Sequence, residues 1–94
     1  MITWETKSSF DKSVKSLPVN DKEAIKALVK SLVSVLEGGR QTDKGLGLTP
    51  LRKNFLEVRA SYKLRILFRW TGNHIEFVLA GNHDQVKRFL KENS

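Results

Sequence analysis

The chain has 94 residues, of which 17 are Lys or Arg and 10 are Asp or Glu, so its formal net charge is +7 and its isoelectric point is near 10.0. This length suits a single domain over residues 1–94 that buries roughly 60–65% of its unfolded surface. The lack of cysteine excludes disulfides and thiolate metal sites, and no apolar run reaches the ~18 residues of a membrane span, so we expect a cytoplasmic protein with phosphate-bearing or acidic partners and no membrane partner.

The first half of the chain predicts a strand followed by two helices. A short strand is expected at residues 2–5, and a helix over residues 7–16 with Thr6 as its cap. Asn20, followed by Glu23 three residues later, has the capping-box pattern that starts a longer helix, and a pair of glycines ends that helix. Apolar residues recur at helical spacing in both, so we expect a helical hairpin packed on one face of a sheet.

Residues 53–83 predict two consecutive β-hairpins, around which the chain is organised. In segments 53–60 and 63–71 the odd positions are mostly charged and the even positions apolar, which indicates one wet face and one buried face. Gly72-Asn73 is a two-residue turn signal, so positions summing to 145 are expected to pair. The first hairpin needs an odd loop, most simply residues 60–62, and the wet face is expected to be concave, basic and open.

This register brings a histidine beside a group of cations. It sets Glu57 opposite Arg65, and Arg65 opposite Ala80. It also carries the chain out of the sheet at His83, next to Lys63 and Arg65. We therefore expect one end of the sheet to hold an imidazole within reach of cationic side chains.

The remaining segments complete an α+β prediction. Residues 39–50 are expected to form a loop, and they lack the GxxxxGK[ST] spacing of a phosphate loop. Asn82 or Asp84 is expected to cap a short C-terminal helix. The predicted fold is a small α+β domain in which an N-terminal strand and a helical hairpin pack on an antiparallel sheet.

The two histidines differ in their predicted roles. His74 lies at the hairpin turn, where an ordinary polar surface residue is expected, whereas His83 is either a loop residue that helps to cap the last helix or a functional group. Two distant histidines without cysteine do not make a metal ligand set. A Ser-His-Asp arrangement stays open, although no nucleophile motif marks one.

A cationic cluster beside a histidine suits metal-free cleavage of RNA, in which the ribose 2′-hydroxyl attacks the adjacent phosphate. Cations stabilise the charge that develops on the phosphate, and a histidine transfers a proton. The same cations also suit phosphate binding without chemistry, and lysines spread over helices are commonly just solvated. Glu57 facing Arg65 is interpreted either as a cross-strand ion pair or as an orienting group or base.

The order of elements, together with the segments LEVR, YKLRILFRW and LAGNHD, resembles the RelE/ParE toxin superfamily over nearly the whole chain. The resemblance implies a RelE-like toxin of a type II toxin-antitoxin system that cleaves mRNA on the ribosome and is neutralised by a cognate acidic antitoxin. It implies no cofactor and no metal. Two alternatives stay open, namely a ParE-like inhibitor of DNA gyrase and a non-catalytic binding module with this fold.

Candidate site residues follow from this chemistry and from positions in the family. The candidate catalytic residues are His83, Arg65, Arg59 and Glu57. The candidate RNA-binding residues are Arg52, Lys53, Lys63 and Arg69. Phe55 and Glu57 stand where the RelE branch has lysines, and Phe89 is the candidate for stacking because no C-terminal tyrosine is present. The histidine variants of the family are therefore the better model.

Overall fold

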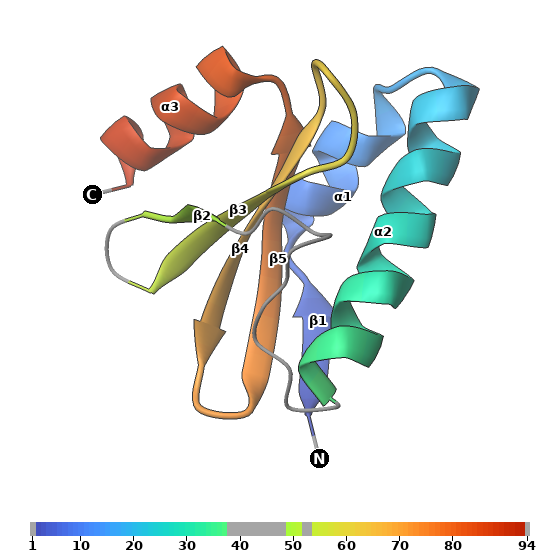
Figure 1. The fold of residues 1–94 in the computed structure, drawn as a ribbon. Coiled ribbons are helices and arrows are strands. Elements are labelled where there is room, and N and C mark those ends of the chain that lie inside the picture. Colours follow the sequence, from blue (N-terminus) through green and yellow to red (C-terminus); the bar gives the residue numbers. More distant parts are fainter. Residues whose placement is uncertain (1, 38–48, 52–53, 94) are drawn as a thin grey trace.

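A computed structural model describes residues 2–37, 49–51 and 54–93 (Figure 1). Within these residues, one sheet has the strand order β1-β5-β4-β3-β2, with β1 parallel to β5 and the other neighbours antiparallel. The strands are β1 (Thr3–Thr6), β2 (Thr49–Pro50), β3 (Phe55–Arg59), β4 (Arg65–Thr71) and β5 (His74–Gly81), and the helices are α1 (Ser8–Lys15), α2 (Val19–Glu37) and α3 (His83–Glu92). The predicted α+β fold class is confirmed.

The helices α1 and α2 cover one face of the sheet, and α3 lies against the other (Figure 1). The N-cap of α1 is Lys7, without a side-chain capping bond, so the prediction of Thr6 is wrong. Thr6 instead pairs with Phe77 as the last residue of β1, which keeps it in the sheet. Because α2 already begins at Val19, Asn20 lies inside its first turn rather than at its cap.

The predicted loop between α2 and β3 can be compared with the structure only in part. The glycine stop of α2 and most of residues 39–50 lie outside the described residues. Thr49 and Pro50, which the sequence assigned to the loop, form β2 opposite Glu57 and Leu56. None of the described helices combines the length and apolar character that crossing a membrane requires.

The β4-β5 hairpin follows the predicted register beside its turn and departs from it further along. Pairing is as predicted from the turn as far as Phe68 opposite Phe77. The register then shifts, because Val78 is an extra residue in β5. Arg65 consequently lies opposite Gly81, one residue further along β5 than predicted.

The β3-β4 hairpin has a wider loop than predicted. Arg59 lies opposite Arg65, so the loop spans residues 60–64 rather than 60–62. The loop is still odd in length, which keeps the apolar positions of both strands on one face. Glu57 is opposite Leu67, and the predicted placement of Glu57 directly across from Arg65 is wrong.

The main core fills the space between the sheet and the helices α1 and α2. Its buried residues are Phe10, Ile25, Val29, Leu32, Leu36, Val58, Leu64, Ile66, Phe68, Ile75, Phe77 and Ala80. The strand β4 contributes Ile66 and Phe68, which the alternation assigned to the buried face. Fully burying such a side chain contributes roughly 1.5–3 kcal/mol, so this cluster holds the helical hairpin on the sheet.

A smaller core lies on the opposite face, under α3. Phe55, Leu67 and Val78 of the sheet pack there with Val86 of α3, and the Phe55 ring meets Phe89 edge to face at 6.5 Å between ring centres. The expectation that this face is open is wrong where α3 covers it. The reason is that odd positions in β3 and β4 also include apolar residues, which need a covering layer.

Candidate functional site

An open hollow of about 470 Å³ lies where the β3-β4 loop meets the start of α3. We call it the basic hollow, and its lining residues are Arg59, Tyr62, Lys63, Arg65, Asn82, His83 and Asp84. It brings together four candidate site residues that were predicted from the sequence and that come from three separate segments, namely His83, Arg59, Lys63 and Arg65. In Figure 1 these segments meet at one end of the sheet.

A capping box positions His83 at the start of α3. The Asn82 Oδ1 atom accepts a hydrogen bond from the Gln85 N–H at 2.8 Å, and the Gln85 Oε1 atom accepts one from the Asn82 N–H at 2.8 Å. Gly81 makes room for this box, because a Cβ atom there would overlap Gln85 Oε1. Asn82, one of the two predicted candidates, is therefore the cap, and the capping role considered for His83 is filled without it.

Arg65 is held by Glu57 from the neighbouring strand. The Arg65 guanidinium donates a hydrogen bond to Glu57 Oε2 at 2.6 Å, and the two side chains are only 18% and 12% exposed. The contact is diagonal, because Arg59 occupies the position directly across from Arg65. Arg65 Nε is buried and has no partner within the described part of the chain. Glu57 thus compensates a mostly buried charge and fixes its position.

The remaining cations of the basic hollow are not compensated in this way. Arg59 and Lys63 make no ion pair with any described residue. Like charges directly opposite in a sheet destabilise it, and Arg59 lies directly opposite Arg65. Asp84 is the only carboxylate in the described lining. The hollow is therefore suited to an anion such as a phosphodiester.

The other candidate RNA-binding residues do not join this hollow. Arg69 lies about 13 Å along β4 from Arg65. Its guanidinium pairs with Glu76 at 3.1 Å and sits over the Phe55 ring, 5.8 Å from the ring centre. Arg52 and Lys53 lie outside the described residues.

Both ring nitrogens of His74 have side-chain partners, although the sequence predicted an ordinary polar surface residue there. Its Nε2 atom lies 2.9 Å from Glu5 Oε2, and its Nδ1 atom lies 2.7 Å from Thr3 Oγ1. The parallel pairing of β1 with β5 sets Thr3 beside His74 and Glu5 beside Glu76, which creates these contacts. The hydrogen bond from His74, and next the charge of Lys7, lower the pKa of Glu5.

These contacts form a network that we call the paired end. It consists of Glu5, Lys7, Arg69, His74 and Glu76. Ligand atoms of Glu5, His74 and Glu76 lie within 4.8 Å of one another, a spacing that suits a metal ion. Both carboxylates, however, already pair with Lys7 or Arg69. The paired end therefore balances its own charges.

Tyr62, Asn82 and Asp84 also line the basic hollow, although none of them was predicted as a site residue. Tyr62 is 86% exposed on the β3-β4 loop. The available signal was an aromatic residue next to a lysine in a basic segment, a combination typical of surfaces that bind single-stranded nucleic acid. Asp84 was considered only as a helix cap.

Comparisons with known proteins identify the fold. No protein-family model matches the chain, and no curated protein sequence is significantly similar to it. The structure is similar to a chain of the Escherichia coli DinJ-YafQ complex, with a TM-score of 0.69 and 17% identity over 92% of this chain and 98% of that one. A metal-bound toxin from Helicobacter pylori has a TM-score of 0.66 and 22% identity over 92% and 99%.

A third similar structure is the RelB-RelE antitoxin-toxin complex from Methanococcus jannaschii. It has a TM-score of 0.68 and 15% identity over 89% of this chain and 95% of that one. The chain therefore has the RelE-like toxin fold over nearly its whole length, as the sequence resemblance predicted.

Proposed function

We propose that the chain is the toxin of a type II toxin-antitoxin system and a metal-independent, ribosome-dependent mRNA endonuclease of the cytoplasm. The observation that carries this proposal is the basic hollow, where His83 lies with three cations, of which only Arg65 has a described carboxylate partner. The RelE-like fold supports the same class of function.

The proposed reaction is transesterification within the RNA chain. The ribose 2′-oxygen bonds to the adjacent phosphorus and the bond from phosphorus to the 5′-oxygen breaks, which leaves a 2′,3′-cyclic phosphate and a 5′-hydroxyl. One proton leaves the 2′-hydroxyl and one is delivered to the 5′-oxygen. A phosphate between Arg59 and Arg65 relieves their mutual repulsion, and the added negative charge of the transition state strengthens this attraction.

His83 is the proposed proton-transfer residue of this reaction. Histidine side chains change protonation near neutral pH, which suits either donation to the 5′-oxygen or removal of the 2′-hydroxyl proton. Asp84 supplies a second titratable group in the same hollow. Glu57 is proposed to position Arg65, because its carboxylate is already bound to that guanidinium.

The proposed protein partner is an acidic antitoxin. The net charge of +7 favours an acidic segment that covers the basic hollow, and such segments commonly fold on binding. Two of the similar structures are complexes with antitoxins, DinJ and RelB, which supports a cognate antitoxin for this chain. The ribosome and its mRNA are the proposed targets.

A cell-free translation reaction with a defined message tests the proposal. We expect the message to be cut only when it is being translated, with cyclic phosphate at the new 3′ ends. The same message without ribosomes is the control and stays intact. Inhibited DNA supercoiling by gyrase with an intact message would instead identify the gyrase inhibitor, and the absence of both effects would leave a binding module.

A further inference from the structure

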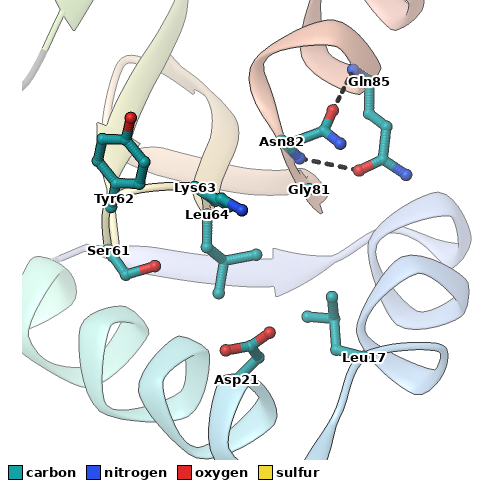
Figure 2. A pocket seen from close by; sticks show the side chains of 9 residues that line it. All are labelled: Leu17, Asp21, Ser61, Tyr62, Lys63, Leu64, Gly81, Asn82 and Gln85. Atoms are coloured by element: carbon teal, nitrogen blue, oxygen red, sulfur yellow. Dashed lines mark hydrogen bonds between the residues drawn. The ribbon is translucent and has the colours of Figure 1, made fainter.

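A second hollow of about 450 Å³ adjoins the basic hollow and shares Tyr62, Lys63 and Asn82 with it. Figure 2 shows it between the β3-β4 loop, the start of α3 and the junction of α1 with α2. Leu17 and Leu64 give it apolar walls. We call it the junction hollow.

The junction hollow carries polar groups that no described residue satisfies. The capping box uses the carbonyl oxygens of Asn82 and Gln85, which leaves both side-chain NH₂ groups as hydrogen-bond donors. The carboxylate of Asp21 has no ion pair or hydrogen bond within the described residues. In Figure 2 the Asp21 carboxylate lies below Leu64, on the side opposite the two amides.

We propose that the junction hollow binds a nucleobase of the RNA whose phosphate lies in the basic hollow, an inference that rests on the proposed function. A base is joined to its phosphate through one ribose. Because the two hollows adjoin and share Tyr62 and Lys63, one can hold the base while the other holds the phosphate that links this nucleotide to its neighbour. The exposed Tyr62 ring offers a stacking surface at the boundary of the two hollows.

Within the junction hollow, the Asp21 carboxylate favours an amino-bearing base. An ionised carboxylate accepts hydrogen bonds and donates none, so Asp21 favours the exocyclic amino groups of guanine, adenine or cytosine. Uracil lacks an amino group, and its one remaining base donor, N3–H, lies between two carbonyl oxygens that a carboxylate repels. The free amide NH₂ groups of Asn82 and Gln85 lie across from Asp21 and suit the ring nitrogens and carbonyls of the same bases.

The test uses five short RNA probes that cannot be cleaved. These are U-N-U trinucleotides with 2′-O-methyl riboses, in which N is guanine, adenine, cytosine, uracil or an abasic sugar. Each is titrated into the folded protein, and both the affinity and the methyl resonances of Leu17 and Leu64 are recorded. We expect the three amino-bearing probes to bind more tightly than the uracil and abasic probes and to shift these methyl resonances.

Variants at the two proposed base contacts sharpen the test. Tyr62→Ala should weaken the binding of amino-bearing probes by about tenfold to a hundredfold, while Tyr62→Phe keeps the ring and the affinity. Asp21→Asn should remove the preference over the uracil probe. Asp11→Asn is the matched control, because Asp11 also lies in the first turn of a helix but does not line the hollow.

Two outcomes would overturn the inference, and they have different consequences for the proposed function. Equal affinity for all five probes with unchanged Leu17 and Leu64 resonances removes the base site and leaves phosphate binding in the basic hollow intact. If no probe binds, the abasic one included, both the base site and the proposed phosphate binding in the basic hollow are ruled out.

Discussion

The two ends of β5 hold the two histidines of the chain, and they differ in how their charges are balanced. At the paired end, His74 lies against Glu5, and each carboxylate has a cationic partner within 4.0 Å. At the other end, His83 lies in the basic hollow, where Arg59 and Lys63 have no acidic partner among the described residues. The charges of the paired end are balanced within the described residues, whereas two cations of the basic hollow are not.

The two regions differ in the placement of charge rather than in its amount. Both regions contain a histidine, cations and carboxylates, so composition does not separate them. What separates them is the pair Arg59 and Arg65, two like charges at directly opposed positions of the sheet. Four measurements test the difference between the two regions.

The largest expected effect is on catalysis and separates the two histidines. His83→Ala should lower message cleavage in cell-free translation by about 10²–10⁴-fold, the usual scale for the loss of a general acid or base. His74→Ala is the matched control and should cleave at the parent rate, because His74 lies in the paired end. Full cleavage by a folded His83→Ala protein would remove this histidine from the mechanism and direct attention to Asp84.

The second effect is on stability and compares two carboxylates. Glu57→Gln should lower the free energy of unfolding by about 1–3 kcal/mol, since it removes the negative charge that compensates the mostly buried Arg65 guanidinium. Glu76→Gln should cost less than about 1 kcal/mol, because Arg69 and Lys7 are each 46% exposed and return to water. Urea unfolding measures both, and equal losses would mean that burial does not distinguish the two pairs.

The third effect is on the salt dependence of RNA binding. Lys63→Ala should reduce the slope of log affinity against log salt by about 0.7, the value for one phosphate contact on a single strand. Lys7→Ala removes the same charge from the paired end and should leave the slope unchanged, because Lys7 is engaged with Glu5 and Glu76. Identical slopes for the two variants would show that overall charge, not the hollow, binds the RNA.

The smallest effect is on acid stability and concerns Glu5. The hydrogen bond from His74 lowers the folded-state pKa of Glu5, so its ionised form stabilises the fold above the unfolded-state pKa. That contribution is lost as the pH falls through the lowered folded-state pKa. The melting temperature of Glu5→Gln should therefore fall less steeply than that of the parent protein as the pH is lowered. The same fall in both proteins would show that Glu5 does not contribute to acid stability in this way.

Much of the sheet was predictable because alternation and turn chemistry act locally. The Gly72-Asn73 turn correctly fixed the pairing as far as Phe68 and Phe77. The bulge at Val78 was not predictable, since the apolar residues around it fit either face. A shift of one residue moves a strand by only about 3.3 Å, so His83 still arrived beside Arg65.

The packing of α3 on the second face of the sheet was not predicted from the sequence, for a different reason. Phe55 and Leu67 occupy odd positions, and the sequence treated them as exceptions on a wet face. The apolar stripe of α3 needed a surface to pack on, but nothing local indicated which one. Tyr62 was missed because its importance depends on two hollows that exist only once three distant segments meet.

The parallel pairing of β1 with β5 delays completion of the sheet until late in synthesis. Thr3–Thr6 pair with residues 74–77, so the first strand made during synthesis has no partner until nearly the whole chain has left the ribosome. Contacts between such distant segments form slowly, because a long loop must close first. During synthesis the nascent chain therefore stays incomplete at both the paired end and the basic hollow.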